Sequence, residues 1–139
     1  APAELEKDFK NFRPFITTWD GSEFYVVNSE IRNMGYAASK SYGITVSTNK
    51  VVQEEFFEEY GDLPRPTGWI INTDFHNMYF GFYSYEAKDF VLYKNTYKDS
   101  VIYGIDPHDR SERLIIAHNY ISGSKKKHGI IISREVNNS

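Results

Sequence analysis

The sequence contains no cysteine, and only 2 of its 139 residues are methionine. Without cysteine there can be no disulfide framework, no thiol nucleophile and no cysteine-ligated metal, and redox chemistry says nothing of the compartment. Long apolar runs are also missing, because the longest are a handful of residues, far short of the roughly 20 that a spanning helix needs. We therefore expect a soluble chain that is not an integral membrane protein.

Neither sign of charge dominates the composition. Lys and Arg number 16 against 19 Asp and Glu, which gives a net charge of −3 and a pI near 5.8. A nucleic-acid-binding domain usually carries a basic field, so no nucleic-acid partner is predicted. The one cationic run, Lys125–Lys127, is interpreted as the solvated tip of a loop.

Aromatic residues are abundant, at 17% of the chain with 11 Tyr and 10 Phe. That content is typical of strands and argues against disorder. We found no internal repeat, linker or low-complexity tract. The length and the uniform composition predict one domain over residues 1–139.

Four aromatic and β-branched runs follow one another in the stretch 69–105. Polar breaks at 74–77, 86–89 and 94–99 separate them and are too short for crossover helices. The pattern therefore predicts consecutive antiparallel strands joined by tight turns. Because such a chain must close its edges, we expect an antiparallel meander β-barrel, with a two-sheet sandwich as the alternative.

Flanking segments complete this expected barrel. An apolar stripe over residues 3–12 predicts a short N-terminal helix, and 114–121 and 130–134 are expected to be further strands. Two loops, 61–68 and 123–129, are long enough to admit a ligand or contact a protein partner. The carboxylates within 54–59 are interpreted as a solvated acidic face.

No nucleophile elbow, phosphate loop or zinc-binding helix motif is present. We therefore predict no catalytic residue, no metal and no cofactor. Of the four histidines, only His118 is expected within a strand and facing inward, so it is the one general base that an enzyme could use here. Tyrosines on the inward faces are expected to line a cavity, because a buried hydroxyl needs a partner. The predicted ligand contacts are Tyr42, His118 and Tyr120, with Trp69, Tyr79 and Tyr83 at the rim.

One family shares this layout. A tryptophan in the first strand (Trp19), an arginine at the end of the last strand (Arg134) and antiparallel strands in meander order resemble the lipocalins, or more broadly the calycins. In that family the tryptophan packs beneath the arginine. The resemblance implies a β-barrel that carries a small hydrophobic molecule.

Two functions are expected on these grounds. The first is a secreted carrier of a small hydrophobic or aromatic ligand, and the alternative is a secreted protein-interaction or inhibitory module acting through its loops. Secretion is inferred from the start Ala1-Pro2-Ala3, because small residues flank signal-peptide cleavage sites. An enzyme is the less favoured class, and the oligomeric state is left open.

Overall fold

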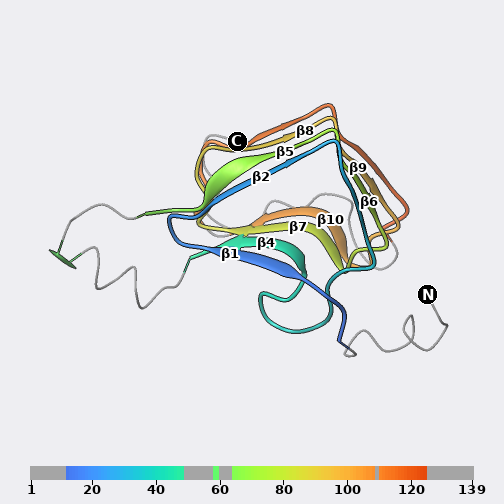
Figure 1. The fold of residues 1–139 in the computed structure, drawn as a ribbon, viewed down its shortest axis with the longest axis horizontal. Coiled ribbons are helices and arrows are strands. Elements are labelled where there is room, and N and C mark those ends of the chain that lie inside the picture. Colours follow the sequence, from blue (N-terminus) through green and yellow to red (C-terminus); the bar gives the residue numbers. More distant parts are fainter. Residues whose placement is uncertain (1–11, 49–57, 60–63, 109, 125–139) are drawn as a thin grey trace.

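The computed structural model describes residues 12–48, 58–59, 64–108 and 110–124. Within these ranges the chain forms twelve short strands, and every pairing between them is parallel. The strands make three sheets of four, which enclose a triangular cross-section (Figure 1). Among the described residues, no helix has the length and apolar character needed to cross a membrane.

The three sheets are named A, B and C. Sheet A contains β1 (Ile16–Trp19), β4 (Gly43–Ser47), β7 (Phe80–Tyr85) and β10 (Tyr103–His108). Sheet B contains β2 (Glu23–Val27), β5 (Thr67–Ile71), β8 (Phe90–Tyr93) and β11 (Ile115–Ala117). Sheet C contains β3 (Glu30–Arg32), β6 (Asp74–His76), β9 (Thr96–Lys98) and β12 (Tyr120–Ser122).

The chain visits the sheets in a fixed cycle of A, B and C, so three successive strands make one coil. Each strand pairs with the strand one coil away, as β2 pairs with β5 and β5 with β8. The four coils stack into a parallel β-helix, a solenoid in which each coil contacts only its neighbours.

This architecture shows that the predicted antiparallel meander barrel is wrong, and so is the sandwich alternative. The short polar breaks were interpreted as hairpin turns, but they turn corners between sheets instead. Parallel neighbours need a long crossover. Here that crossover consists of the other two strands of the coil. With no barrel, the basis of the lipocalin resemblance is lost.

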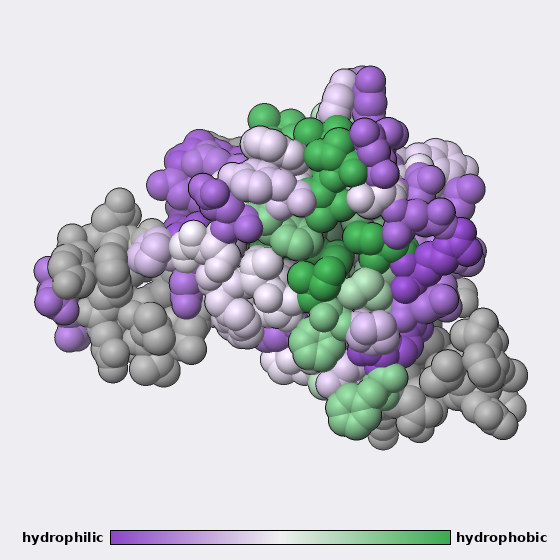
Figure 2. All heavy atoms as spheres, in the orientation of Figure 1, coloured by the Kyte–Doolittle hydropathy of each residue, from purple (hydrophilic) through white to green (hydrophobic). Residues whose placement is uncertain are grey.

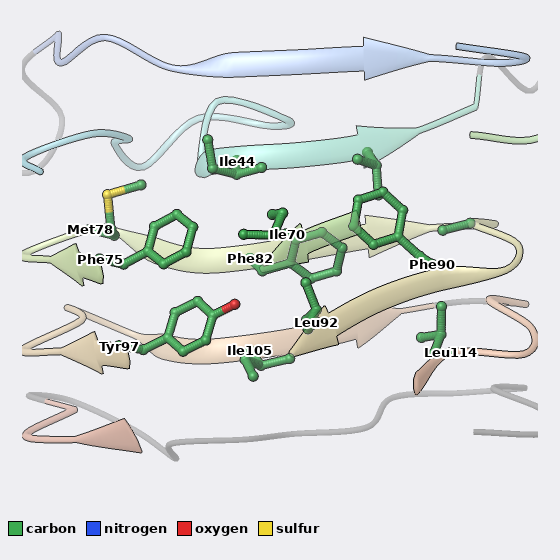
Figure 3. Packing of buried hydrophobic residues seen from close by; sticks show 12 residues of the cluster. Ile44, Ile70, Phe75, Met78, Phe82, Phe90, Leu92, Tyr97, Ile105 and Leu114 are labelled. Carbon is green, nitrogen blue, oxygen red and sulfur yellow. The ribbon is translucent and has the colours of Figure 1, made fainter. Parts of the chain in front are cut away.

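The interior is filled by apolar side chains from the strands of each coil, stacked in rows along the axis. The rings of Phe75 and Tyr97 are an example, with centroids 4.7 Å apart and planes within 1° (Figure 3). Seen along the view of Figure 1, hydrophobic residues gather in the middle and hydrophilic ones along the margins (Figure 2). The cluster of buried residues is Ile44, Val46, Ile70, Phe75, Met78, Phe82, Ala87, Phe90, Leu92, Tyr97, Ile105 and Leu114.

The corner between sheets B and C has the same construction in every coil. A residue with left-handed backbone ends the sheet B strand, and a polar residue follows it. The left-handed residues are Asn28, Asn72, Lys94 and His118, with φ between 50° and 55°. Asparagine tolerates this region better than other non-glycine residues because its short side chain hydrogen-bonds locally.

The polar residues after these corners form an internal ladder. Asn95 Nδ2 donates to the Ile70 carbonyl at 2.8 Å, and Asn119 Nδ2 donates to the Leu92 carbonyl at 2.9 Å. Asn119 Oδ1 in turn accepts from the Asn95 amide at 3.0 Å. The ladder satisfies backbone groups that would otherwise be orphaned inside the solenoid.

The chain therefore does contain an internal repeat, and the expectation of none is wrong. Each copy has a left-handed residue, a small polar residue, a three-residue strand with a central apolar residue, and a second left-handed residue. The four copies are 28–34, 72–78, 94–100 and 118–124. Periods of about 20–25 residues are typical of solenoids.

Several smaller expectations can be compared with the structure. Trp19 is 41% exposed and not buried at a barrel end, and its predicted partner Arg134 lies outside the described residues. The predicted strand 114–121 is interrupted at His118, which is an exposed corner between β11 and β12. The predicted helix 3–12 and strand 130–134 lie outside the described residues, apart from Phe12.

A candidate active site on the outer face of sheet A

The outer face of sheet A carries a cluster of aromatic rings. Tyr42 lies just before β4, and its ring stacks on that of Phe80 in β7 at 4.6 Å. Tyr79 stacks on the same Phe80 at 5.3 Å, while Tyr103 of β10 meets it edge-on at 5.2 Å. Tyr83 adjoins Tyr42 at 4.9 Å. Strand register explains the grouping, because Phe80 is paired with both Gly43 and Tyr103.

Desolvation affects Tyr79 in this cluster. Burial raises the pKa of Tyr79, and the neighbouring Tyr42 raises it further. The hydroxyl of Tyr79 therefore keeps its proton to a higher pH than a tyrosine in water does. It is available as a hydrogen-bond donor and not as an anion.

A histidine and a carboxylate lie at the end of β10, beside these rings. Asp106 and His108 alternate onto one face of the strand, and they pair in register with Tyr83 and Tyr85 of β7. The imidazole of His108 lies 5.5 Å from the Tyr83 ring, and its Nδ1 is 3.9 Å from Oδ1 of Asp106. Asp106 is almost fully buried. At 3.9 Å the carboxylate acts on the ring by its charge and not by a hydrogen bond, and it favours a proton on Nδ1, so that Nε2 is the nitrogen that accepts a proton.

Two cations flank the same face. Lys40 reaches across from the loop before β4, with its Nζ 4.9 Å from the centre of the Tyr83 ring and 4.1 Å from that of Tyr85. Arg110 donates from Nη2 to the Tyr85 hydroxyl at 3.3 Å. Positive charge over tyrosine faces is favourable by about 0.5–2 kcal/mol. The face therefore combines aromatic rings with positive charge.

A buried carboxylate orients one of these cations. Glu86 follows β7, and its side chain accepts from Thr48 Oγ1 at 3.0 Å and forms an ion pair with Arg110. Arg65 Nε donates to the Glu86 carbonyl at 2.8 Å. The hydrogen bond to Glu86 is the largest cause of the raised pKa of Arg110. Arg110 is thus held by Glu86 beside Tyr85, the residue that pairs in register with His108.

The structure brings three of the six predicted ligand contacts together. Tyr42, Tyr79 and Tyr83 all belong to the cluster on sheet A. As ligand contacts, these and the other three stay predictions.

The other three lie elsewhere. Trp69 lies on the outer side of sheet B, where its ring meets Tyr25 at 4.3 Å. His118 lies in an exposed corner, and Tyr120 begins β12 in sheet C with 60% of its surface exposed.

Sequence reasoning missed Tyr103, Asp106 and His108, although they are the chemically richest residues of this face. The sequence predicts a polar loop over 107–112, whereas the structure places Pro107 and His108 in β10. Proline occurs in strands at sheet edges, and the described part of sheet A ends at β10. The usable signal was the alternation of Asp106 and His108, which places both on one side of a strand.

Among the described residues, no group of three His, Asp or Glu side chains is placed to hold a metal ion. The arrangement instead offers a histidine beside a buried carboxylate, tyrosine hydroxyls and cations, all on the outer face of one sheet. Such a set can move protons at an anionic substrate that lies across the sheet.

Comparison with known proteins agrees with this geometry. No family model matches the chain. The chain is 54% identical over 130 residues to the mannuronan C5-epimerase of Pseudomonas putida, covering 94% of this chain and 24% of that protein. It is 50% identical over 130 residues to the mannuronan C5-epimerase AlgG of Azotobacter vinelandii, again covering 94% and 24%. The chain thus spans about a quarter of the length of the curated relatives it matches.

Solved structures give the same result. The chain superimposes on the periplasmic alginate epimerase AlgG with a TM-score of 0.85 and 52% identity, covering 92% of this chain and 29% of that one. A double-mutant form of AlgG gives a TM-score of 0.88 at 50% identity, covering 95% and 30%.

These findings correct four further expectations. The relatives are epimerases, so the lipocalin-like family and the carrier function are wrong. The expected partner, a small hydrophobic molecule, is wrong as well, because the relatives' names point to mannuronan and alginate. The alternative of a secreted interaction module finds no support among the relatives. Export from the cytoplasm agrees with the periplasmic description of AlgG, whereas release from the cell does not.

Proposed function

We propose that this chain forms part of a mannuronan C5-epimerase, with its reaction centre on the outer face of sheet A. The observation that carries the proposal is the placement of His108, buried Asp106 and the tyrosine cluster on one outward face. Identity of 50–54% to proteins named as such epimerases supports the same assignment.

The chemistry sets three requirements. C5 of a mannuronate residue carries the carboxylate, so inversion at C5 breaks a C–H bond next to a carboxyl group. A base must take that proton, and an acid must return one to C5 from the opposite face of the sugar. Positive charge or hydrogen bonds must stabilise the carboxylate while it carries the extra electron pair.

His108 and Tyr103 fit the two proton-transfer roles. Both belong to β10, five residues apart, which separates their Cα atoms by about 16 Å at 3.3 Å per residue. We infer that the reacting sugar ring lies between these two side chains. Tyr83 is a poorer candidate for the second role, because its ring already lies against His108.

In this scheme one of the two side chains takes the C5 proton and the other supplies its own. His108 accepts at Nε2, while Asp106 stabilises the resulting imidazolium. The Tyr103 hydroxyl donates from the other side. Afterwards the His108 imidazolium releases its proton to water and the Tyr103 phenolate takes one up, which restores both side chains. The net change is the exchange of one C5 proton for another on the opposite face, so no oxidant or co-reactant is consumed.

The shape of the site suits a polymer. A flat outward face lets a chain of sugars pass across several strands, and rings such as Tyr42 and Tyr79 offer apolar surfaces to the sugar C–H groups. The cations Lys40 and Arg110 complement the negative charge of polymannuronate. A pocket closed around a small molecule is not needed.

The direct test is proton exchange at C5. The full-length protein incubated with polymannuronate in D₂O should incorporate deuterium at C5 as guluronate appears. His108→Gln and Tyr103→Phe should each lower kcat by at least about 10²-fold, the usual contribution of a general acid or base. Both variants should still bind the polymer. Full activity in His108→Gln would refute the assignment.

We also propose the periplasm as the site of action. The expected export and the periplasmic description of the solved AlgG structure support it. Fractionation of cells expressing the full-length protein tests this compartment directly. Recovery from the culture medium or the cytoplasm would contradict it.

A further inference from the structure

We propose that Lys40 binds the carboxylate of the uronate that adjoins the reacting sugar, and so selects charged polymer over neutral polysaccharide. This inference rests on the proposed function, and it assigns a role to a residue outside the proton-transfer pair. It concerns the loop before β4, which is not part of the regular coil.

The loop holds Lys40 firmly against sheet A. The Lys40 carbonyl accepts a hydrogen bond from Thr17 Oγ1 in β1 at 3.0 Å. Within the loop, the Tyr36 amide donates to the Ser41 carbonyl at 2.9 Å and the Ser41 amide donates to that of Ala38 at 3.0 Å. Lys40 itself has a φ of 63°. The backbone is therefore positioned so that the side chain runs over the outer face of the sheet.

Two tyrosines then direct the ammonium group. It lies 4.1 Å from the Tyr85 ring centre and 4.9 Å from that of Tyr83, and donates to the Tyr83 hydroxyl at 3.4 Å. A lysine side chain loses rotamer entropy when it is fixed. Packing of the stem and head on two rings offsets part of that cost before any substrate binds.

The position relative to His108 is what suggests the neighbouring sugar. Both residues lie beside the ring of Tyr83. The centre of this ring is 5.5 Å from that of the His108 imidazole and 4.9 Å from Nζ of Lys40. Lys40 approaches Tyr83 from the β4 side, and His108 approaches it from the β10 side. A polymer that runs along the solenoid axis would bring an adjoining sugar toward Lys40.

The charge environment favours an anion there. Lys40 and Arg110 both carry positive charge to the ring of Tyr85, at 4.1 Å and 5.8 Å from its centre. A lysine acts as a compact point charge that suits carboxylates without demanding bidentate geometry. A polyuronate presents one carboxylate per sugar, so the one beyond the reacting residue meets this ammonium.

The chain offers a matched control on another face. Lys94 also has a left-handed backbone, with φ of 55°, and its Nζ lies 5.1 Å over the ring of Tyr93. It belongs to the corner between sheets B and C, away from sheet A. Lys94→Met removes the same kind of cation–π contact without touching the candidate site.

The experiment uses the full-length protein with Lys40→Met, Lys40→Arg and Lys94→Met. Steady-state epimerisation of polymannuronate is measured at several salt concentrations. Lys40→Met should raise KM about tenfold, lower kcat less than threefold and flatten the salt dependence of KM. Lys40→Arg should restore KM to within about threefold, and Lys94→Met should match the parent protein.

Affinity measurements distinguish charge recognition by Lys40 from a purely structural role of this residue. In a His108→Gln background, which binds without turnover, the affinity for polymannuronate is compared with that for neutral mannan. Lys40→Met should weaken the binding of polymannuronate and leave that of neutral mannan unchanged. An unchanged KM, a loss confined to kcat, or equal weakening for both polymers would overturn the role of Lys40. Absence of epimerisation in the parent protein would instead refute the proposed function.

Discussion

The side-chain amide of Asn95 donates a 2.8 Å hydrogen bond to the carbonyl of Ile70, which lies one coil away. The same side chain accepts from the Thr73 amide at 2.9 Å, and it is fully buried. One asparagine therefore links two coils from inside the solenoid. Such links are a main polar contribution to stacking, because the sheet hydrogen bonds alone do not satisfy the corners.

Replacing Asn95 should be costly. Asn95→Ala leaves a buried carbonyl and a buried amide without partners, and each orphaned group costs about 1–3 kcal/mol. We expect the free energy of unfolding to fall by about 2–4 kcal/mol in urea or thermal denaturation. The control is Asn28→Gly, because Asn28 is an exposed corner residue with φ of 53°. A loss below about 1 kcal/mol for Asn95→Ala would contradict the ladder.

His118 allows the two candidate bases to be compared. It lies exposed in a corner with φ of 55°, a backbone conformation that favours glycine. His118→Gly should leave epimerisation unchanged and raise stability by up to about 1 kcal/mol, since it relieves backbone strain. His108→Gln should abolish activity without unfolding the protein. Loss of activity in His118→Gly would return the base to the residue that the sequence first indicated.

Many of the strands could be predicted from the sequence, but the way they pair could not. The runs that begin at Trp69 and Met78 are expected as strands, because aromatic and β-branched residues fit a pleated sheet, and they overlap β5 and β7. Pairing depends on the direction that the chain takes after each strand. A short polar break has the same composition in a hairpin turn and in a solenoid corner, so the breaks alone do not distinguish them.

The internal repeat would have distinguished a solenoid corner from a hairpin turn. Asn72-Thr73 and Asn28-Ser29 occupy equivalent corners, as the structure shows, yet later copies carry Lys94 and His118 at the same position. The copies share a backbone conformation and not a residue type, and that conformation is invisible to simple sequence comparison. Longer segments between β3 and β4 and between β4 and β5 also break the regular spacing.

Only part of the candidate site could be predicted from the sequence, for a related reason. Tyrosines were expected to line a ligand site, and three of the six named residues gather on sheet A. Their neighbours come from other coils, at distances along the chain that only the stacking register sets. His108 is brought to Tyr83 by the pairing of β10 with β7. No local pattern predicts that contact.

The ion pair of Asp89 with Arg113 predicts a small dependence of stability on pH. Arg113 Nε lies 2.5 Å from Asp89 Oδ1, and this hydrogen bond is the main cause of the lowered pKa of Asp89. A folded-state pKa below the ordinary 3.8 means that the pair stabilises the protein above about pH 4. The contribution is lost as the pH falls through the folded pKa.

Asp89→Asn therefore should lower the free energy of unfolding at pH 7 by less than about 1 kcal/mol, because the pair is largely exposed. At about pH 2 the variant and the parent should be equally stable. Urea denaturation at both pH values measures the difference. If the difference in unfolding free energy between the variant and the parent grows as the pH falls, the ion pair does not stabilise the protein in the way proposed.

The last prediction concerns Gly81, where β7 approaches β10 most closely. A Cβ atom at this position would lie 2.2 Å from the Gly104 carbonyl oxygen and 2.5 Å from Cδ1 of Tyr97. Neither neighbour can yield easily, since one is backbone and the other is a fully buried ring stacked on Phe75. Gly81→Ala should thus destabilise the protein by about 3 kcal/mol through overpacking.

Activity should fall together with stability. Gly104 adjoins Tyr103 in β10, so pushing β10 outward moves Tyr103 relative to His108. The measurements are the unfolding free energy and kcat on polymannuronate, with Gly21→Ala as control. Gly21 is exposed and a Cβ there would meet only the Pro64 side chain, at 3.0 Å, so its cost should stay below about 1 kcal/mol. A stable and active Gly81→Ala protein would contradict the close approach of the two strands, and with it the geometry assigned to the reaction centre.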